Sequence, residues 1–186
     1  MSKAFDPDVL GDIVQRCVGL PYDQMLDAIS EELDSRYPKR RIRKKRRWVF
    51  SNAGGAMLQI TLLYGSLTEY LAFANTPVGT EGHSGIYQAD VWDWVLDGEM
   101  WCHILGQTER SVYRPGDVAF LARSVAKGFC VKDHVTLLEY AQGFIPLMMP
   151  FGLADSVFST LDCRSVRHQM WQYGTMCTRE LLRGKI

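Results

Sequence analysis

The sequence lacks several features that would assign a chain to a class at a glance. Its five cysteines form no Cys-x-x-Cys pair, which argues against a disulfide scaffold or a cysteine zinc site and is compatible with a reducing compartment. It lacks net charge, because 21 Lys and Arg balance 21 Asp and Glu, so a uniformly basic nucleic-acid-binding protein is not expected. Its four histidines include no His-x-His pair, so no paired-histidine metal site is expected either.

The sequence also lacks a clear membrane-spanning run. The first 19 residues are interrupted by acidic and basic side chains and have no continuous apolar region, so they do not form a signal peptide. Residues 49–68 carry no charge over about the length that a bilayer requires, but polar side chains and Gly54-Gly55 interrupt them. Residues 144–154 are too short and contain two prolines. We therefore expect no spanning helix.

What the sequence does contain is a globular composition arranged in three zones. The chain has 186 residues, 47% of them hydrophobic and 23% charged, which is enough for one domain with a real core. Residues 1–47 are predicted to be a helical segment with a basic run, 48–143 a β-rich zone, and 144–186 a second helical segment. The three zones are expected to form one integrated domain of class α+β.

Both ends of the chain have the apolar spacing of amphipathic helices. In the N-terminal zone the spacing recurs before and after Pro21, and Pro38 ends the second stretch. In the C-terminal zone two apolar stretches are separated by residues 162–165, where a helix can break. Two interpretations of this C-terminal pair remain open: packing against the barrel, or lying in a membrane interface.

A dense basic run occupies residues 39–47 and is interrupted only by Ile42. Like charges this close repel one another, so the run is expected to be solvated or to face something anionic. Three interpretations stay open: an exposed linker, contact with anionic lipid headgroups, or a nuclear-localisation or nucleic-acid patch. No aromatic residue interleaves the run, so stacking on nucleic acid is not supported.

The central zone has many short runs rich in β-branched and aromatic residues, with turn signals between them. This pattern predicts a sandwich or a barrel. The segment 113–118 resembles a cupin turn, in which Pro115-Gly116 tightens a hairpin, and the scattered histidines make such a barrel metal-free. Turns are predicted at Asp97-Gly98, 115–117 and Lys127-Gly128. The predicted strands are 48–52, 57–63, 86–96, 100–105, 111–113, 118–122, 128–132 and 136–141.

Two acids stand out as candidates for chemistry. Asp93 lies in a strand-like run and by alternation faces the side opposite to Asp90. Glu139 lies in the most apolar stretch of the β zone, where an ionised carboxylate is costly unless it is paired. If both carboxylates meet in one apolar cavity, one keeps its proton and the dyad can donate and accept protons. The alternative is that each acid sits at a strand edge or turn and faces water.

Several long blocks, in order along the chain, resemble one family. They are WVFSNAGGAM at 48–57, SLTEY at 66–70, GTEGHSG at 79–85, GFIP at 143–146 and FGLADSVFSTLD at 151–162. The family comprises the fungal C-8 (Δ8–Δ7) sterol isomerases and the sigma non-opioid (sigma-1) receptors. The resemblance runs from about residue 25 to the C-terminus. The Gly-Thr-Glu-Gly-His block is more similar to the isomerase branch.

The resemblance implies a cupin-like β-barrel over a hydrophobic pocket, capped by two C-terminal helices that rest on a membrane, and a homotrimer. Glu139 matches the buried glutamate that meets the cationic amine of family ligands, Asp93 its carboxylate partner, and Tyr70 the tyrosine that hydrogen-bonds the glutamate. The implied pocket wall consists of Ser51, Ala56, Ile60, Leu62, Ala72, Ala74, Val91, Val131, Leu147, Met149, Gly152 and Tyr173. Some of these are small, as at Ala56 and Ala74, which leaves room for a bulky polycyclic ligand.

The function implied by the resemblance is isomerisation of a sterol from Δ8 to Δ7 by protonation and deprotonation through a carbocation, with Glu139 and Asp93 as the catalytic dyad. The alternative is a non-enzymatic, receptor-like protein that binds cationic amphiphilic amines and sterols. Accessory candidates by motif position are His83, Asp90, Glu69 and Glu81. No cofactor, metal or nucleic acid is expected. Family members usually begin with a transmembrane helix, which this sequence lacks. We expect peripheral membrane association, at the endoplasmic reticulum in a eukaryote or at the cytoplasmic membrane surface in a bacterium.

Overall fold

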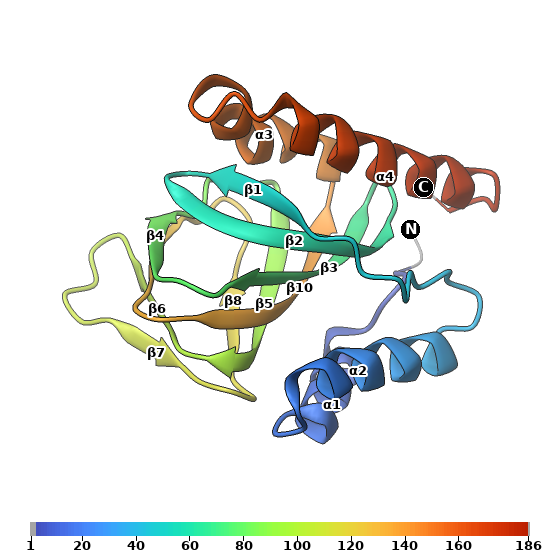
Figure 1. Cartoon of the computed structure of the whole chain (residues 1–186), viewed down its shortest axis with the longest axis horizontal. Helices are drawn as coiled ribbons and strands as arrows, with labels where there is room; N and C mark the ends of the chain where they lie inside the picture. The colour runs from blue at the N-terminus through green and yellow to red at the C-terminus, as the bar shows by residue number, and fades with distance from the viewer. Residues whose placement is uncertain (1–2, 186) are drawn as a thin grey trace.

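The structure is a computed structural model that describes residues 3–185 (Figure 1). The outermost residues of the first and last predicted zones, 1–2 and 186, lie outside the described residues. The helices within it are α1 (Pro7–Cys17), α2 (Tyr22–Arg36), the short 3₁₀ turn η1 (Ile145–Leu147), α3 (Met149–Phe158) and α4 (Cys163–Leu181). The strands are β1 (Val49–Ala53), β2 (Ala56–Gly65), β3 (Glu69–Thr76), β4 (Thr80–His83), β5 (Ala89–Gly98), β6 (Met100–Ile104), β7 (Ser111–Tyr113), β8 (Val118–Leu121), β9 (Lys127–Val131) and β10 (Val135–Gly143).

The strands form two antiparallel sheets that together make a barrel. The larger sheet has the order β1-β2-β3-β10-β5-β8, and the smaller has the order β4-β9-β6-β7. Successive side chains of a strand point to opposite faces, so each strand of the larger sheet serves two layers. On β3, Leu71 and Phe73 face outward toward the N-terminal helices, whereas Ala72 and Ala74 face the barrel interior. The α+β class and the barrel predicted from the sequence are confirmed.

The helices α1 and α2 pack on the outer face of the larger sheet. Asp6 caps α1 by accepting a hydrogen bond from the Asp8 amide, and Pro7 occupies the first turn, where its missing N–H costs nothing. Leu10, Ile13 and the apolar side chains of α2 are fully buried against the sheet. The apolar spacing in the N-terminal zone therefore predicted these two helices and the face that each one buries.

The C-terminal helices lie on a different side of the barrel, along β1 and β2 (Figure 1). The predicted break between the two helices is confirmed, but it lies at residues 159–162 and not at 162–165. α3 ends at Phe158, and Asp162 caps α4 by accepting from the Ser165 amide. Tyr173, Met176 and Cys177 of α4 pack on the barrel. No helix among residues 3–185 is long and apolar enough to span a bilayer.

Two strands and one turn differ from the prediction. Both β3 and β4 are absent from the predicted strands, because β3 contains alanines of low β propensity and β4 is short and contains glycine. Hydrogen bonding to β2 on one side and β10 on the other stabilises β3 in spite of that composition. The turn predicted at Lys127-Gly128 is wrong: both residues begin β9 and pair with β4 and β6.

The basic run 39–47 is not a free linker. Arg46 makes ion pairs with Asp23 and Asp27 of α2, and Lys44 pairs with Asp34 at 2.9 Å. Arg40 reaches the buried Glu180 of α4 at 3.4 Å. These ion pairs connect the run 39–47 to α2 and α4. Periodicity could not predict them, because it does not show which acids lie beside the basic residues. Lys39, Arg41, Lys45 and Arg47 remain exposed.

Candidate active site

An apolar cavity of about 240 Å³ lies between the inner face of the barrel and the C-terminal helices. The larger sheet supplies small and branched side chains, and η1, α3 and α4 supply larger ones such as Met148, Phe151 and Tyr173. Only a few charged groups interrupt this lining, and they gather where β5, β9 and β10 meet. The arrangement is that of a binding site for an apolar molecule with a few convergent polar groups.

Glu139 and Asp93 meet in this cavity. They are direct cross-strand partners on β10 and β5, and both face inward. The Tyr70 hydroxyl on β3 donates a hydrogen bond to Oε1 of Glu139. The remaining exposed area of Glu139 faces the cavity, while Asp93 is only 6% exposed. Strand register therefore brings together the three residues that the family resemblance assigned to the site.

A fourth charged group, Lys127, completes the cluster. Its Nζ lies 2.6 Å from Oδ2 of Asp93, and both side chains are 8% exposed. The ion pair joins β9 of the smaller sheet to β5 of the larger one. Oδ1 of Asp93 is buried and has no hydrogen-bond partner among the described residues. Sequence reasoning missed Lys127, although alternation with Phe129 and Val131 on an otherwise apolar strand face could have revealed it.

The surroundings of the cluster change the proton affinity of Glu139. Burial, followed by the charge of Asp93, raises the pKa of Glu139 to about 7, although the Tyr70 hydrogen bond and Lys127 oppose the rise. Burial alone lowers the pKa of Lys127, but interactions with Asp93, Cys102 and Glu139 together outweigh it, so that pKa is raised and the ammonium stays charged. Burial also raises the pKa of Tyr70 well above its usual value, so the hydroxyl keeps its proton. Near neutral pH, Glu139 is therefore the group that gains and loses a proton.

Residues 2–185 match the family described as "ERG2 and Sigma1 receptor like protein". The chain belongs to this family. It is 38% identical over 181 residues to the C-8 sterol isomerase erg2 of Aspergillus fumigatus, which covers 96% of this chain and 74% of that protein. It is 34% identical over 174 residues to the sigma non-opioid intracellular receptor 1 of Xenopus tropicalis, which covers 93% of this chain and 79% of that protein.

Solved structures that are similar to part of this ERG2 and sigma-1 receptor family member include cupins. Among the similar solved structures is an RmlC-like cupin from Shewanella frigidimarina, which is 18% identical and has a TM-score of 0.46. That likeness covers 54% of this chain and 86% of the cupin. Within residues 3–185, no three His, Cys, Asp or Glu side chains are grouped so that they could hold a metal ion.

Most of the wall residues implied by the family resemblance line the cavity, and three do not. Those that line it are Ser51, Ala56, Ile60, Leu62, Tyr70, Ala72, Val91, Met149, Gly152 and Tyr173. Ala74 and Val131 are buried in a neighbouring cluster, where side chains of the barrel fill the space below the acids. Leu147 is 63% exposed, because the 3₁₀ turn η1 points it away from the barrel.

The four accessory candidates separate in the same way. His83 lines the cavity at its rim, and its Nδ1 accepts a hydrogen bond from the Gly85 amide. Asp90 faces the outside and pairs with Arg123 at 2.7 Å, and Glu81 is exposed on β4. Glu69 is buried, but on the opposite face of β3 from the cavity. The structure therefore groups only His83 with the acids.

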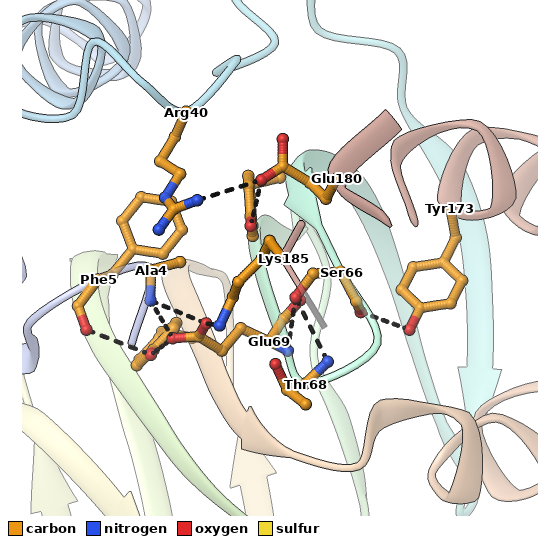
Figure 2. Close-up of polar contacts among 11 residues, drawn as sticks. Ala4, Phe5, Arg40, Ser66, Thr68, Glu69, Tyr173, Glu180 and Lys185 are labelled. Atoms are coloured by element: carbon orange, nitrogen blue, oxygen red, sulfur yellow. Dashed lines mark hydrogen bonds and ion pairs between the residues drawn. The ribbon is translucent and has the colours of Figure 1, made fainter. Parts of the chain in front are cut away.

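Glu69 belongs to a separate polar cluster that Figure 2 shows. Its carboxylate accepts hydrogen bonds from the Ala4 amide at 2.8 and 2.9 Å and from the Tyr140 hydroxyl at 2.5 Å, and it pairs with Lys185 at 2.7 Å. Beside it, Glu180 of α4 accepts from Tyr64 at 2.9 Å. This outer cluster ties residues from both ends of the chain to the barrel.

Proposed function

We propose that this protein is a C-8 sterol isomerase that moves a ring double bond from Δ8 to Δ7. The observation that carries the proposal is a glutamic acid in an apolar cavity whose pKa of about 7 lets it hold and release a proton at neutral pH. The naming of several relatives as C-8 sterol isomerases, at 34–42% identity, supports this assignment.

In the proposed reaction, Glu139 donates its proton to C9. The C8=C9 electron pair forms the new C9–H bond and leaves a tertiary carbocation at C8. The Glu139 carboxylate that results, in an apolar environment with little competing water, stabilises this cation electrostatically. A carboxylate of the Glu139–Asp93 dyad then removes a proton from C7, and the C7–H electrons form the C7=C8 double bond. The protein regains the proton that it gave, so the reaction consumes no cofactor.

Conversion of a Δ8 sterol by purified protein, followed by gas chromatography, tests the proposal. Glu139→Gln and Asp93→Asn are each expected to lower turnover by about 10³-fold or more while the barrel stays folded. Asp90→Asn is the matched control on the same strand, because Asp90 faces outward to Arg123. Full activity in either dyad variant would exclude a catalytic role for the dyad. Isomerase activity itself would be excluded if the purified wild-type protein is inactive and the gene does not rescue an isomerase-deficient yeast.

A receptor-like protein without activity is the second candidate. The same carboxylates in an apolar cavity suit a cationic amphiphilic amine, and the sigma non-opioid receptors at 33–34% identity favour it. Tight amine binding without sterol conversion would favour this candidate over the isomerase.

We also propose that the C-terminal helices rest on a membrane, at the endoplasmic reticulum in a eukaryotic cell or the cytoplasmic membrane surface in a bacterium. Large apolar side chains are strongly exposed there: Phe158 by 84%, Trp171 by 72% and Leu182 by 84%. A triple serine variant at these positions is expected to lose flotation with anionic vesicles. Leu105→Ser, at an equally exposed apolar residue of a barrel loop, should leave flotation unchanged. Loss of flotation in both variants alike would exclude the helices as the docking face.

The homotrimer implied by the family resemblance is retained as part of the proposal. Sedimentation equilibrium of the purified protein is expected to give three times the chain mass of 21.2 kDa. A monomer at micromolar concentration would exclude it.

A further inference from the structure

The proposed mechanism uses Glu139 and Asp93 and leaves the buried lysine of the same cavity without a role. Lys127 is the residue in question, and its ammonium sits in the same cavity as the two acids. A lysine inside an apolar cavity is costly to desolvate, so its presence changes what the cavity can bind. We propose that Lys127 is a specificity-determining residue: it limits the cavity to a single negative charge, so that a neutral sterol and a cationic amine require opposite protonation states of Glu139.

The geometry assigns the positive charge of Lys127 to Asp93. Nζ lies 2.6 Å from Oδ2, and both side chains are more than nine-tenths buried. The neutralised pair leaves Glu139 as the acid whose charge varies. With Glu139 protonated the cluster is neutral and suits an uncharged polycycle, and with Glu139 ionised it is anionic and suits an ammonium group.

Without Lys127, the net charge of the cluster would no longer switch between neutral and anionic with the protonation of Glu139. Two carboxylates that face each other from neighbouring strands share one proton over a wide pH range, and the pair stays singly anionic throughout. A cavity of that kind would attract cations even while it holds a proton. Lys127 therefore makes the cavity discriminate against amines whenever Glu139 is ready to donate.

The remaining titratable groups that face Glu139 come from several elements. Tyr70 on β3 donates to it, Tyr87 precedes β5, His83 lies at the rim on β4, and Tyr173 on α4 donates to the Ser66 carbonyl. Cys102 on β6 lies near Lys127, and burial raises its pKa to about 11, so it stays neutral. His83 is the imidazole among these groups, and a variant of it is measured separately.

The test measures binding of dodecyltrimethylammonium below its micelle concentration, by calorimetry from pH 5 to 8. This probe carries a permanent charge, so any pH dependence belongs to the protein. For the wild-type protein we expect affinity to rise about tenfold between pH 5 and 6 and to level off above pH 7, because one proton leaves for each probe bound.

Three variants separate Lys127 from its neighbours. Lys127→Met is expected to bind the probe at least tenfold more tightly than wild type at pH 6, with little pH dependence. The double variant Lys127→Met/Asp93→Asn has the same net charge as the wild-type cluster, and it should restore the rise with pH. Lys132→Met removes an exposed lysine just beyond β9 and should leave the curve unchanged. His83→Gln is measured as well, and loss of the pH dependence in this variant would overturn the proposal.

Superimposable curves for wild type and Lys127→Met would overturn the proposal, as would a wild-type curve that is flat. If Lys127→Met does not fold, the double variant still tests the proposal, because it removes both charges of the ion pair and leaves neither one buried alone. A flat curve in that variant would overturn the proposal equally. The inference rests on the proposed function in one respect: the neutral ligand is taken to be the sterol substrate. If the probe-binding curves match these expectations but the protein converts no sterol, the proposed isomerase activity is excluded and the proposed role of Lys127 in amine binding stands.

Discussion

Two Glu–Tyr pairs link the same two strands, and they have opposite properties. β3 carries Glu69-Tyr70, and β10 carries Glu139-Tyr140. Alternation sends Glu69 and Tyr140 to the outer face and Tyr70 and Glu139 to the cavity. On each face the tyrosine of one strand donates a hydrogen bond to the glutamate of the other. The inner and outer pairs are thus built from one motif on two sides of one sheet.

The surroundings decide what each glutamate does. Glu69 receives two backbone hydrogen bonds from Ala4 and an ammonium from Lys185 in addition to its tyrosine. Glu139 has its tyrosine and a like charge across the strand, since Asp93 is its direct partner. A buried carboxylate with several donors stays ionised and holds structure together, whereas one with few donors becomes a proton carrier. The motif itself does not encode the role.

The largest expected effect on stability comes from the outer pair. Glu69→Gln leaves Lys185 with no carboxylate at Glu69 and weakens the hydrogen bonds from Ala4 and Tyr140, so we expect a loss of about 3–5 kcal/mol in the free energy of unfolding. Urea denaturation at pH 7 measures it. Glu81→Gln, at an exposed acid on the next strand, should change stability by less than about 0.5 kcal/mol. A similarly small loss for Glu69→Gln would remove the distinction between the two pairs.

The inner pair should respond in the opposite direction. The folded state holds the Glu139 proton up to about pH 7, whereas the unfolded state loses it near 4.5, so wild-type stability falls as pH rises between these values. Glu139→Gln removes this titration. The quantity to compare is the unfolding free energy of the variant minus that of wild type. This difference is expected to be more favourable to the variant at pH 8 than at pH 4, by about 3 kcal/mol. Parallel urea curves at the two pH values measure the difference, and a gap that does not widen with pH would contradict the assignment.

The tyrosines give the smallest and sharpest contrast. Tyr140→Phe removes a donor from an ionised carboxylate and is expected to cost about 1–2 kcal/mol of stability with unchanged turnover per folded molecule. Tyr70→Phe removes a hydrogen bond that lowers the pKa of Glu139. The decline of activity at high pH should therefore shift to higher pH. Sterol conversion between pH 5 and 9 measures that shift. Equal pH profiles for the two variants would contradict the inner and outer roles.

The sequence predicted the elements whose pattern is local. Apolar spacing located the long helices among the described residues, and Pro38 gave the end of α2 because a proline acts within one turn. Resemblance of the 48–57 and 79–85 blocks supplied the family. Periodicity did not find β3, because its alanines fit a strand only when β2 and β10 pair with it from both sides.

The charges of the site were harder to predict, because pairing is a long-range property. Asp93 and Glu139 drew attention as acids in apolar runs, but nothing local indicated that Lys127, 34 residues from Asp93 along the chain, would meet it across two sheets. Glu69 was an accessory candidate by motif position, and strand register places it on the opposite face of β3 from the cavity. The exposed Leu147 differs from expectation because a 3₁₀ turn rotates it outward.

The cavity wall has two origins, and this has a consequence for how such proteins diverge. The acids and the lysine stand on hydrogen-bonded strands, whereas Met148, Met149 and Phe151 come from the C-terminal helices. Unbranched methionine side chains adapt their shape without backbone movement. Substitutions on the helices can therefore change the shape of the cavity while Glu139, Asp93 and Lys127 stay in register on the strands. Related proteins could therefore come to bind a different polycyclic or amphiphilic ligand without substitutions in the barrel strands. They could also keep ligand binding after a loss of turnover.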